Sequence, residues 1–550
     1  MPARARLKQI TRVSSRVCPP PPSPPSSSIR ADPEPQSQIL ILILILILPP
    51  MLQDAAAPTA PVVTIDAWAL GAFIAYLALV VGIGAASARV SSAGLTEFFL
   101  GGRRMNRFVV ALSAVVSGRS SWLLLGVTGM AFTIGASALW AVAGYTAVEA
   151  ALFLFYAPRL RRFSERYDSI TLPDFFADRF RDTGGLRVVL AAVILVFMVA
   201  YVAAQFVGGG KAIGASFGLS PGTGIAITAA IVLGYTVLGG FVAVSLTDTV
   251  QALFMLFALL ALPWVAIADF GGWGAVVAEL RSVDSSLVDP VAIGFGALLG
   301  FVGIGLGSPG NPHILVRYMS IHDPRQLRFA AFVGTTWNVL MGTGAVLIGL
   351  VGRAFIDGVE SLPQADPENL FPVLAQQHLP PALFGMIVAA IFAAIMSTAD
   401  SQLLVAASTV VRDVYEKVVR RGRPLDERRL VVYSRLVVTA LVALALLLGW
   451  AADELVFWLV LFAWAGLGAA LGPTSILALF WRRTTRAGVF AGLIAGTVTT
   501  VVWYWTPALK GALYELIPAF AAGLLATVIV SLLTRPPADT EAMFRAMEDR

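Results

Sequence analysis

Long apolar runs separated by short polar loops fill the chain from Asp66 onward. Roughly 20 predominantly apolar residues are enough for a helix to cross a bilayer core about 30 Å thick. Because lipid offers no partner to an open backbone, each long run is expected to be a helix. The pattern predicts an all-α polytopic membrane protein with 13 transmembrane helices. The predicted spans are 66–88, 108–133, 138–157, 187–208, 223–239, 244–268, 291–315, 328–350, 384–410, 430–449, 454–480, 487–505 and 513–534.

The composition supports this class. Hydrophobic residues make up 57% of the 550 residues and charged residues 13%, whereas soluble domains carry roughly 25% charged residues. The one cysteine, Cys18, excludes an intrachain disulfide, and the three histidines lack the spacing of metal ligands. The sequence contains no G-x-x-x-x-G-K-[ST] motif, so it carries no signature of ATP binding. No Ser-His arrangement, and no pair of intramembrane carboxylates with a histidine, suggests an enzyme.

Lysine and arginine concentrate in alternate loops between the predicted spans. The other set of loops holds only Lys211, Arg281, Arg353 and Lys510. Because cytoplasmic loops are enriched in these residues, we expect the first helix to start outside and the tail, 535–550, to be cytoplasmic. The expected location is the plasma (inner) membrane. Topology thus accounts for the net charge of +6, and no nucleic-acid partner is implied.

Residues 1–60 differ from the rest of the chain. They contain PPPPSPPSSS and ten alternating isoleucines and leucines, Ile39–Leu48. Ten residues of helix reach only about 15 Å, which is too short to span. We expect a disordered leader or a misassigned start, with the protein beginning at Met51. A signal sequence is the alternative, because a basic stretch precedes the apolar run.

Two predicted spans contain residues that interrupt a helix. Span 108–133 includes SGRSSW, Ser117–Trp122. Glycine and serine hold a helix interior poorly, and Arg119 lies near the midplane, where a charge is costly and usually functional. Span 291–315 includes GFVGIGLGSPGNPHILV, whose glycines and prolines argue against an unbroken helix.

The two interrupted spans would each open a group of five helices, 108–268 and 291–480, and would cross the membrane in opposite directions. Broken helices at matching places of inverted repeats are typical of secondary transporters. We therefore expect a 5+5 inverted-repeat core, with 66–88 as a peripheral first helix and 487–534 as two further peripheral helices. Two kinked helices in an unrelated bundle are the alternative.

Polar residues also lie inside two later spans. Asp248 lies one to two turns into span 244–268, and Ser397, Thr398 and Asp400 lie together in span 384–410. Hydroxyls beside a carboxylate would supply the oxygen ligands that hard cations such as Na⁺ prefer. Such hydroxyls also have a structural alternative, because they bond to carbonyls of their own helix or join helices. The structural alternative for Asp248 is an ion pair with an arginine in a loop.

Seven stretches of the sequence are distinctive: FFLGGRRMNRFVVALSA, SSWLLLGVTGMAF, ITLPDFFADRF, GGFVAVSLTDTVQALFMLFAL, NPHILVRYM, AAIFAAIMSTADSQLLVAAS and FAWAGLGAALGPTSILALFW. Together they closely resemble the sodium/solute symporter family, and within it the sodium/proline symporters, over about residues 66–535. The resemblance implies thirteen helices with a LeuT-like inverted-repeat core around a central substrate.

The resemblance also implies site residues. A sodium site would lie between spans 108–133 and 384–410; its ligands would be the carbonyls near Val116 and Arg119, the carbonyl of Ala394, and the hydroxyls of Ser397 and Thr398. Asp248 matches a membrane acid that the family uses in sodium coupling. The substrate region would comprise Arg119, Ser120, Ser121, Trp122, Tyr201, Ser308 and Pro309. The resemblance implies no cofactor and no metal beyond sodium.

The chain departs from the sodium/proline symporters at both interruptions. Where those proteins carry an aspartate, this chain has Gly118, followed by Arg119. Where they carry a tryptophan and a tyrosine in span 291–315, it has Ile304 and Ser308. A different substrate from proline and a different coupling ratio are therefore open.

Arg119 admits three roles. It would pair with Asp248 or Asp400 as structural glue, hold a substrate carboxylate through two parallel hydrogen bonds, or act as a tethered cation in place of one sodium. Because the sodium ligands are kept, we expect sodium-coupled symport of a small organic solute into the cell, with an amino acid such as proline as first candidate.

The alternatives are a sodium-independent or proton-coupled carrier of a carboxylate solute that uses Arg119, and a transporter-like solute sensor. The expected partners are the solute, Na⁺ and the lipid bilayer. The oligomeric state is left open.

Overall fold

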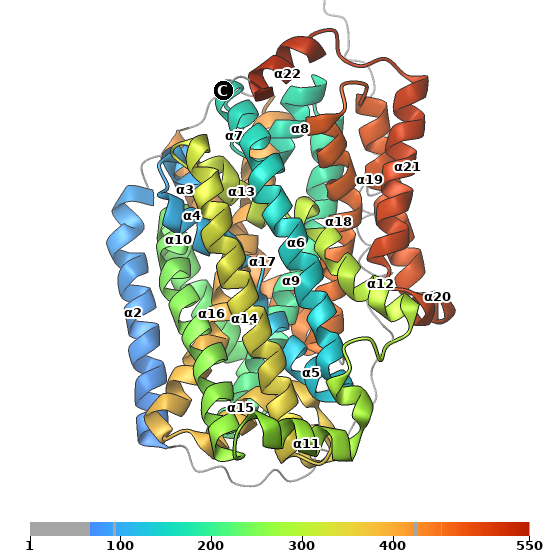
Figure 1. Ribbon diagram of the computed structural model, residues 1–550. Coiled ribbons are helices and arrows are strands. Elements are labelled where there is room, and N and C mark those ends of the chain that lie inside the picture. Colours follow the sequence, from blue (N-terminus) through green and yellow to red (C-terminus); the bar gives the residue numbers. More distant parts are fainter. Residues whose placement is uncertain (1–65, 92–94, 422–425, 453, 549–550) are drawn as a thin grey trace, which may run out of the picture. The chain divides into compact units, whose positions relative to one another are not determined.

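The computed structural model describes residues 66–91, 95–421, 426–452 and 454–548 (Figure 1). The predicted leader, 1–60, lies outside these residues. Within them every regular element is a helix, and the one β-bridge joins Met105 to Ile321. The expected all-helical class is confirmed for this part of the chain.

The α-helices are α2 (Ala67–Ser91), α3 (Leu95–Leu100), α4 (Arg107–Ser117), α5 (Thr128–Ile134), α6 (Leu139–Ala151), α7 (Ala157–Arg166), α8 (Leu172–Phe180), α9 (Gly185–Phe217), α10 (Pro221–Asp269), α11 (Trp273–Val283), α12 (Phe295–Gly303), α13 (Pro312–Ser320), α14 (Leu327–Phe355), α15 (Leu370–His378), α16 (Pro381–Ser408), α17 (Glu427–Trp450), α18 (Val456–Phe480), α19 (Arg486–Tyr504), α20 (Pro507–Ala512), α21 (Leu516–Leu533) and α22 (Thr540–Glu548). The π-helical segments are η2 (Trp122–Val127), η4 (Leu152–Tyr156) and η11 (Thr409–Val419). The short 3₁₀ segments are η1 (Gly101–Arg103), η3 (Gly135–Ala138), η5 (Ser285–Val288), η6 (Ile304–Gly310), η7 (Pro324–Gln326), η8 (Val359–Ser361), η9 (Pro363–Ala365) and η10 (Pro367–Asn369).

Ten helices in the described part of the chain are long and apolar enough to cross a membrane. Three shorter apolar helices accompany them: Arg107–Ser117, Pro221–Val237 and Phe295–Gly310. Two of the three are halves of the spans expected to be interrupted, which is why they are short. The chain is therefore a multi-pass membrane protein.

Two connections between predicted spans are tighter than the sequence suggests. Spans 223–239 and 244–268 join within α10 at Gly240, whose φ is +61°. Span 108–133 passes into span 138–157 at Gly135, whose φ is +66°. Glycine adopts this left-handed backbone at little cost because it lacks a Cβ, so the chain turns sharply without a polar loop.

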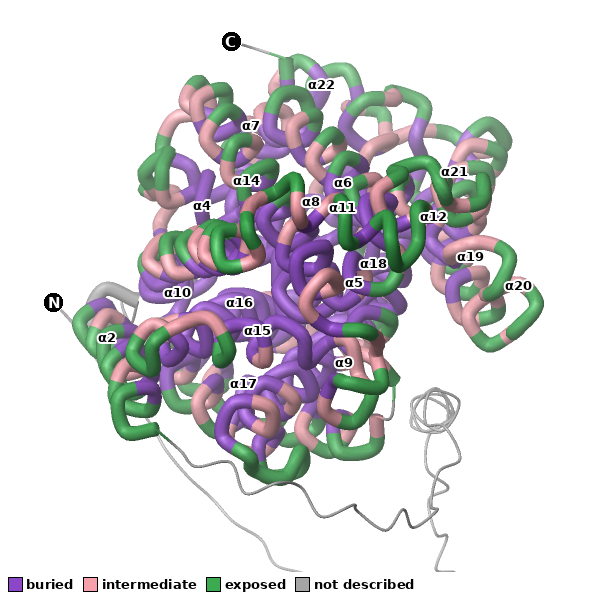
Figure 2. Tube along the Cα trace, turned by 60° about the horizontal axis from the view of Figure 1, so that its bottom comes forward, coloured by how far each residue is buried: buried purple, intermediate pink, exposed green. Residues whose placement is uncertain are grey.

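Burial separates inner from outer helices. In the most apolar stretch of α18, 89% of the residues are buried, against 28% in the corresponding stretch of α2 and of α21. Figure 2 shows α16 mostly buried and α2 largely exposed, whereas α21 mixes exposed, intermediate and buried residues. Large apolar side chains such as Trp264 and Phe332 are more than two-thirds exposed, which suits a surface that faces lipid.

The two expected interruptions are confirmed. The helix α4 ends at Ser117, residues Gly118 and Arg119 form a turn, and the chain becomes helical again before η2. In the second interruption α12 ends at Gly303, a 3₁₀ segment follows, and α13 begins at Pro312. Both breaks lie among the inner helices. The last two turns of α4 and Arg119 are buried, and η6 packs against α6 and α18.

Glycines allow this second break to approach its neighbours. A Cβ at Gly144 of α6 would collide with the carbonyl of Val302, and one at Gly305 would collide with the carbonyl of Gly144. On the other side, a Cβ at Gly310 would collide with the carbonyl of Leu467 in α18. Small residues at helix contacts let backbones pack closely in membranes, so these glycines hold the break in place.

We expect Gly144→Ala to lower the melting temperature of the purified protein, because overpacking costs typically about 1–3 kcal/mol. Gly234→Ala is the matched control, since nothing lies within 4 Å of a Cβ at that position of α10. Equal melting temperatures for the two variants would contradict the packing described for α6 and η6.

Candidate functional site

The break after α4 changes the hydrogen-bond partners of one backbone carbonyl in the protein interior. In a continuous helix, the amide of Ser120 would donate to the carbonyl of Val116. It donates instead to Thr398 Oγ1 on α16, at 3.2 Å. The Val116 carbonyl accepts a tighter bond from the amide of Arg119, at 3.0 Å, and keeps a lone pair for another partner. The last carbonyls of α4 also carry the negative end of its dipole.

Hydroxyls of α16 gather at this carbonyl. The hydroxyl of Ser397 lies 3.4 Å from Val116 O and 3.2 Å from Ala394 O. The hydroxyl of Thr398 lies 3.5 Å from Val116 O. We call Val116 O, Ala394 O, Ser397 Oγ and Thr398 Oγ1 the oxygen cluster. Both hydroxyl-bearing residues are fully buried.

The oxygen cluster has the chemistry of a site for a small monovalent cation. In secondary transporters with discontinuous helices, unwound backbone carbonyls and half-helix ends coordinate Na⁺, and hydroxyls offer further oxygen atoms of the kind that hard cations prefer. The structure brings together Val116, Ala394, Ser397 and Thr398. The Arg119 carbonyl instead accepts the amide of Leu123, at 3.3 Å, as the chain resumes its helix.

The side chain of Arg119 has a different partner from those expected. It forms an ion pair with Glu149 of α6, so the expected pairing with Asp248 or Asp400 is wrong. Its Nε donates to Asn338 Oδ1 of α14, at 2.8 Å, and its Nη1 to the carbonyl of Gly118, at 3.1 Å. Its guanidinium carbon lies 3.7 Å from the centre of the Tyr145 ring.

A small pocket lies beside this ion pair. Its walls are Gly118, Arg119, Trp122, Tyr145, Tyr201, Ile304, Val460, Leu461 and Trp464. The cavity measures about 10 Å³, and a single water needs roughly 10–15 Å³. A solute therefore enters only if these walls move apart.

The expected substrate residues of the first break do not all face this pocket. Arg119 and Trp122 of the break line it, together with Tyr201 of α9. Ser120 lies behind, 3.5 Å from the Tyr201 hydroxyl, and Ser121 donates its amide and its hydroxyl to Gln205 Oε1 of α9 at 3.0 and 2.9 Å.

The expected residues of the second break lie close by. The hydroxyl of Ser308 is 3.5 Å from Glu149 Oε1, so this break contacts the acid that pairs with Arg119. The carbonyl of Pro309 accepts the hydroxyl of Ser475 on α18, at 3.1 Å. The two breaks thus meet through Glu149, with Pro309 facing the opposite side.

Asp248 belongs to a neighbouring cluster, one turn away from the oxygen cluster toward the start of α4. Its Oδ2 accepts the hydroxyl of Ser113 at 2.5 Å and faces Arg317 Nη2 at 3.4 Å. Arg317 also donates to Ser401 of α16, which lies 3.2 Å from Ser117 Oγ. Asp248 therefore pairs with an arginine, as the structural alternative for this residue predicts. That arginine, however, is buried in a helix and does not lie in a loop.

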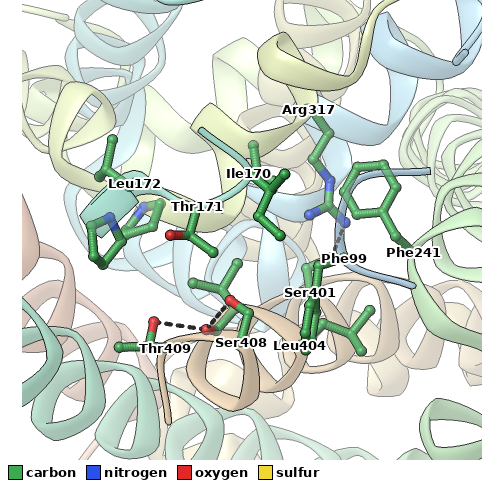
Figure 3. Close-up of a pocket in the computed structure, with 14 residues that line it drawn as sticks. Phe99, Ile170, Thr171, Leu172, Phe241, Arg317, Ser401, Leu404, Ser408 and Thr409 are labelled. Carbon is green, nitrogen blue, oxygen red and sulfur yellow. Dashed lines mark hydrogen bonds between the residues drawn. The ribbon is translucent and has the colours of Figure 1, made fainter. Parts of the chain in front are cut away.

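Figure 3 shows Arg317 in the wall of a second pocket, beside Phe241 and bonded to Ser401. The other walls are Phe99, Ile170, Thr171, Leu172, Pro173, Pro312, Val316, Leu404, Val405, Ser408 and Thr409. This pocket lies toward α8, at the end of the helices where the arginine-rich α7 and the tail helix α22 also lie (Figure 1). Arg317 thus stands between this pocket and Asp248.

An acidic residue closes the other end of the central region. Glu368 in η10 accepts the amides of Val456 and Phe457 at the start of α18, at 3.0 and 2.8 Å, and pairs with Lys211 at 2.5 Å. Burial raises the pKa of Glu368, although the Lys211 ammonium opposes that shift. Phe457 in turn stacks on Trp122 with 5.9 Å between ring centres.

Three functional candidates did not emerge from the sequence: Glu149, Arg317 and Asn338. Glu149 carried the same signal as Arg119, an ionisable residue inside a predicted span. Arg317 lies two residues past the predicted end of span 291–315, and α13 continues to Ser320. A single asparagine such as Asn338 offers no comparable signal.

Thr398→Val removes one hydroxyl of the oxygen cluster while keeping the shape of the side chain. We expect the Na⁺ concentration for half-maximal binding to rise about tenfold or more, which corresponds to roughly 1.4 kcal/mol. Na⁺ titration of the purified protein measures this. Thr439→Val on α17 is the matched control, because that exposed hydroxyl bonds only to its own helix at Arg435 O. Equal Na⁺ affinity in both variants would contradict the assignment.

Asp248→Asn should lower the melting temperature more than the double variant Asp248→Asn/Arg317→Gln. Removing one partner of a buried pair leaves the other charge of that pair unpaired, which costs about 3–5 kcal/mol, whereas removing both leaves neither charge of the pair behind. Thermal unfolding of the wild type, Asp248→Asn, Arg317→Gln and the double variant checks this. Additive losses in the double variant would show that the two charges do not interact.

Comparison with known proteins agrees with this geometry. The sequence model of the Sodium:solute symporter family matches residues 98–496. The chain is 41% identical to the high-affinity proline transporter PutP of Bacillus subtilis (strain 168), over 81% of this chain and 94% of that protein. It is 38% identical to the osmoregulated proline transporter OpuE of the same organism, over 82% and 93%. It is 36% identical to a sodium/proline symporter of Staphylococcus aureus, over 86% and 94%.

Solved structures show the same fold. A substrate-bound, outward-open Na⁺-coupled sialic acid symporter superimposes with a TM-score of 0.71 at 18% identity, covering 86% of this chain and 99% of that one. Mhp1, a nucleobase-cation-symport-1 family transporter in a closed conformation, gives 0.53 at 15% identity, over 83% and 99%. At these identities the likeness is one of fold alone.

The family match, the long and well-covered relatives, and an oxygen cluster at a broken helix lead to one conclusion. The chain belongs to the sodium:solute symporter family; it is a membrane symporter with Na⁺ as its coupling ion, not an enzyme.

Proposed function

We propose that this protein is a sodium-coupled importer of a small amino acid, with proline as the first candidate. The observation that carries the proposal is the oxygen cluster at the break after α4, where Val116 O meets two hydroxyls of α16. The proline transporters and the sodium/proline symporter to which the chain is similar support the choice of solute.

The proposed architecture has 13 spans, with a 5+5 inverted-repeat, LeuT-like core. The repeats are 108–268 and 291–480, the helices 66–88 and 487–534 are peripheral, and 535–550 is the tail. The positions of the two breaks, at the start of each repeat, support this division. The first helix starts outside and the tail is cytoplasmic in the plasma membrane, because the arginine-rich loops lie at the α7 end.

In the proposed ion site, Na⁺ is held by the oxygen cluster. The carbonyl of Arg119, which accepts the amide of Leu123, would contribute through its second lone pair. Such a cation would join α4 to α16, since its ligands come from both. Asp248 lies one turn nearer the cytoplasmic end, which makes it the acid that an ion leaving the cluster would meet next. In this conformation the Asp248 carboxylate is paired with the Arg317 guanidinium.

In the proposed solute site, Arg119, Trp122 and Tyr201 form the pocket wall, and Ser308 meets it through Glu149. Ser120, Ser121 and Pro309 support the two breaks from behind. The pocket is nearly closed, so solute entry requires the helices around it to separate.

The break couples ion binding to solute binding because it contributes a backbone carbonyl to the ion site and a side chain to the solute site. Its backbone faces α16 at the oxygen cluster, while the Arg119 side chain, three residues along from Val116, faces the pocket. An ion that draws α4 and α16 together therefore also fixes the backbone that carries Arg119. A membrane potential contributes about 2.3 kcal/mol per charge per 100 mV to inward movement of the ion.

Membrane vesicles containing the protein should accumulate radiolabelled L-proline only under an inward Na⁺ gradient. A tenfold gradient with 100 mV supplies about 3.7 kcal/mol per Na⁺, enough to concentrate a neutral solute several hundredfold. Choline in place of Na⁺, and a Na⁺ ionophore, are the controls. Uptake that is equal in choline would overturn sodium coupling; uptake of a different solute class under the same gradient would overturn the choice of proline alone.

A further inference from the structure

Arg119 and Glu149 form an ion pair beside the central pocket, and both residues are only 1% exposed. Asn338 bonds to both: its Oδ1 accepts from Arg119 Nε at 2.8 Å, and its Nδ2 donates to Glu149 Oε2 at 2.7 Å. Each charge therefore has the other, and one shared amide, as its main partners. Arg119 Nη1 bonds only to the carbonyl of Gly118.

The acid comes from another helix but lies against the break itself. A Cβ at Gly118 would lie 3.6 Å from Glu149 Oε1. This is an ordinary van der Waals distance, so the Glu149 carboxylate that α6 delivers lies in contact range of the break. The break consequently presents a cation on its own chain and an anion from its neighbour, side by side, where the pocket begins.

This arrangement is complementary to a molecule that bears both charges. The carboxylate of an α-amino acid can take the place of Glu149 on the guanidinium, while its ammonium takes the place of Arg119 on the Glu149 carboxylate. Every charge then stays paired. A solute with only a carboxylate would leave Glu149 unpaired, and a solute with only an ammonium would leave Arg119 unpaired. A buried charge without a partner is strongly unfavourable.

The rest of the pocket suits a small apolar body. Its walls include Trp122, Tyr145 and Trp464, which favour an aliphatic side chain or ring. Trp122 Nε1 is buried and has no hydrogen-bond partner among the described residues. A buried donor left unpaired is unfavourable, and a solute carboxylate beside Arg119 offers an acceptor in the same pocket.

We propose that Arg119 and Glu149 are the specificity-determining pair for a zwitterionic solute: the guanidinium binds its carboxylate, the Glu149 carboxylate binds its ammonium, and the two side chains pair with each other when the site is closed. Asn338 is a positioning residue that holds both side chains. The inference rests on the proposed symport function, because it assumes that the solute binds at this pocket.

The test is a binding assay on the full-length protein in detergent with Na⁺, independent of transport. The probes are the twenty standard amino acids, tetrahydro-2-furoate (the proline shape without the amine) and pyrrolidine (without the carboxylate). Wild-type protein should bind at least one zwitterion, with proline expected, about 100-fold or more tighter than its matched single-charge analogues. Sites built around buried polar groups reject analogues that leave those groups unpaired at least this strongly.

Two variants test whether Arg119 and Glu149 cause the preference for a zwitterion over single-charge analogues. In Glu149→Gln, preference for the zwitterion over its deaminated analogue should fall to less than about tenfold, because the ammonium has lost its partner. The double variant Arg119→Gln/Glu149→Gln leaves no unpaired charge, so it should fold even if the single variant does not, and it should bind both kinds of solute weakly without discrimination. Glu416→Gln is the matched control, a buried acid that pairs with Arg412 outside the pocket.

Two results would overturn the inference. One is a zwitterion preference that persists in the double variant, which would make the pair structural. The other is wild-type protein that binds a single-charge solute as tightly as any amino acid, or binds no amino acid. Sodium-driven uptake of another solute by the same preparation would leave the symport assignment standing, so the two failures are distinguishable.

Discussion

The polar groups released by a broken helix need partners in a place where neither lipid nor bulk water supplies them. Most of the functional geometry of this protein follows from that constraint. At the break after α4 the amide of Ser120 finds Thr398, and the carbonyl of Val116 finds the hydroxyls of α16. The helix pair α4–α16 is thereby tied together by groups that also suit a small cation.

The same constraint organises the second break. The glycines of η6 let its backbone lie against α6 and α18, and Ser308 reaches the acid on α6 that pairs with Arg119. Two interruptions that are far apart in the sequence therefore share one buried ion pair. This ion pair has no net charge. It consists of Arg119, which lies on the first break, and Glu149 of α6, which lies beside Gly118.

The sequence predicts some of these features and not others, for physical reasons. Clusters of glycine, serine and proline are unfavourable in a helix interior, so both interruptions could be located from local pattern alone. The hydroxyls of α16 were also visible, because they cluster in an apolar run. The bond from Ser120 to Thr398 links positions 278 residues apart, and no local pattern encodes such a contact.

The misses follow the same logic. Arg119 was assigned possible partners from acids that the pattern had already singled out, whereas its partner Glu149 lies 30 residues away on α6. Arg317 lies past the predicted end of span 291–315 because the apolar run ends before α13 does. The turn at Gly240 within α10 was expected as a loop, since φ cannot be inferred from hydropathy. Helix content and breaks are local properties, whereas the choice of partners depends on packing.

The central claim is that a cation is held where the interrupted α4 meets α16. A high-resolution experimental structure of the protein with Na⁺ tests it most directly, with thallium as a heavier monovalent substitute to identify the ion. The account predicts cation density in contact with Val116 O and with the hydroxyls of Ser397 and Thr398, together with a turn at Gly118 and Arg119. A continuous helix through Ser117–Trp122, or a cation bound only elsewhere, would contradict it.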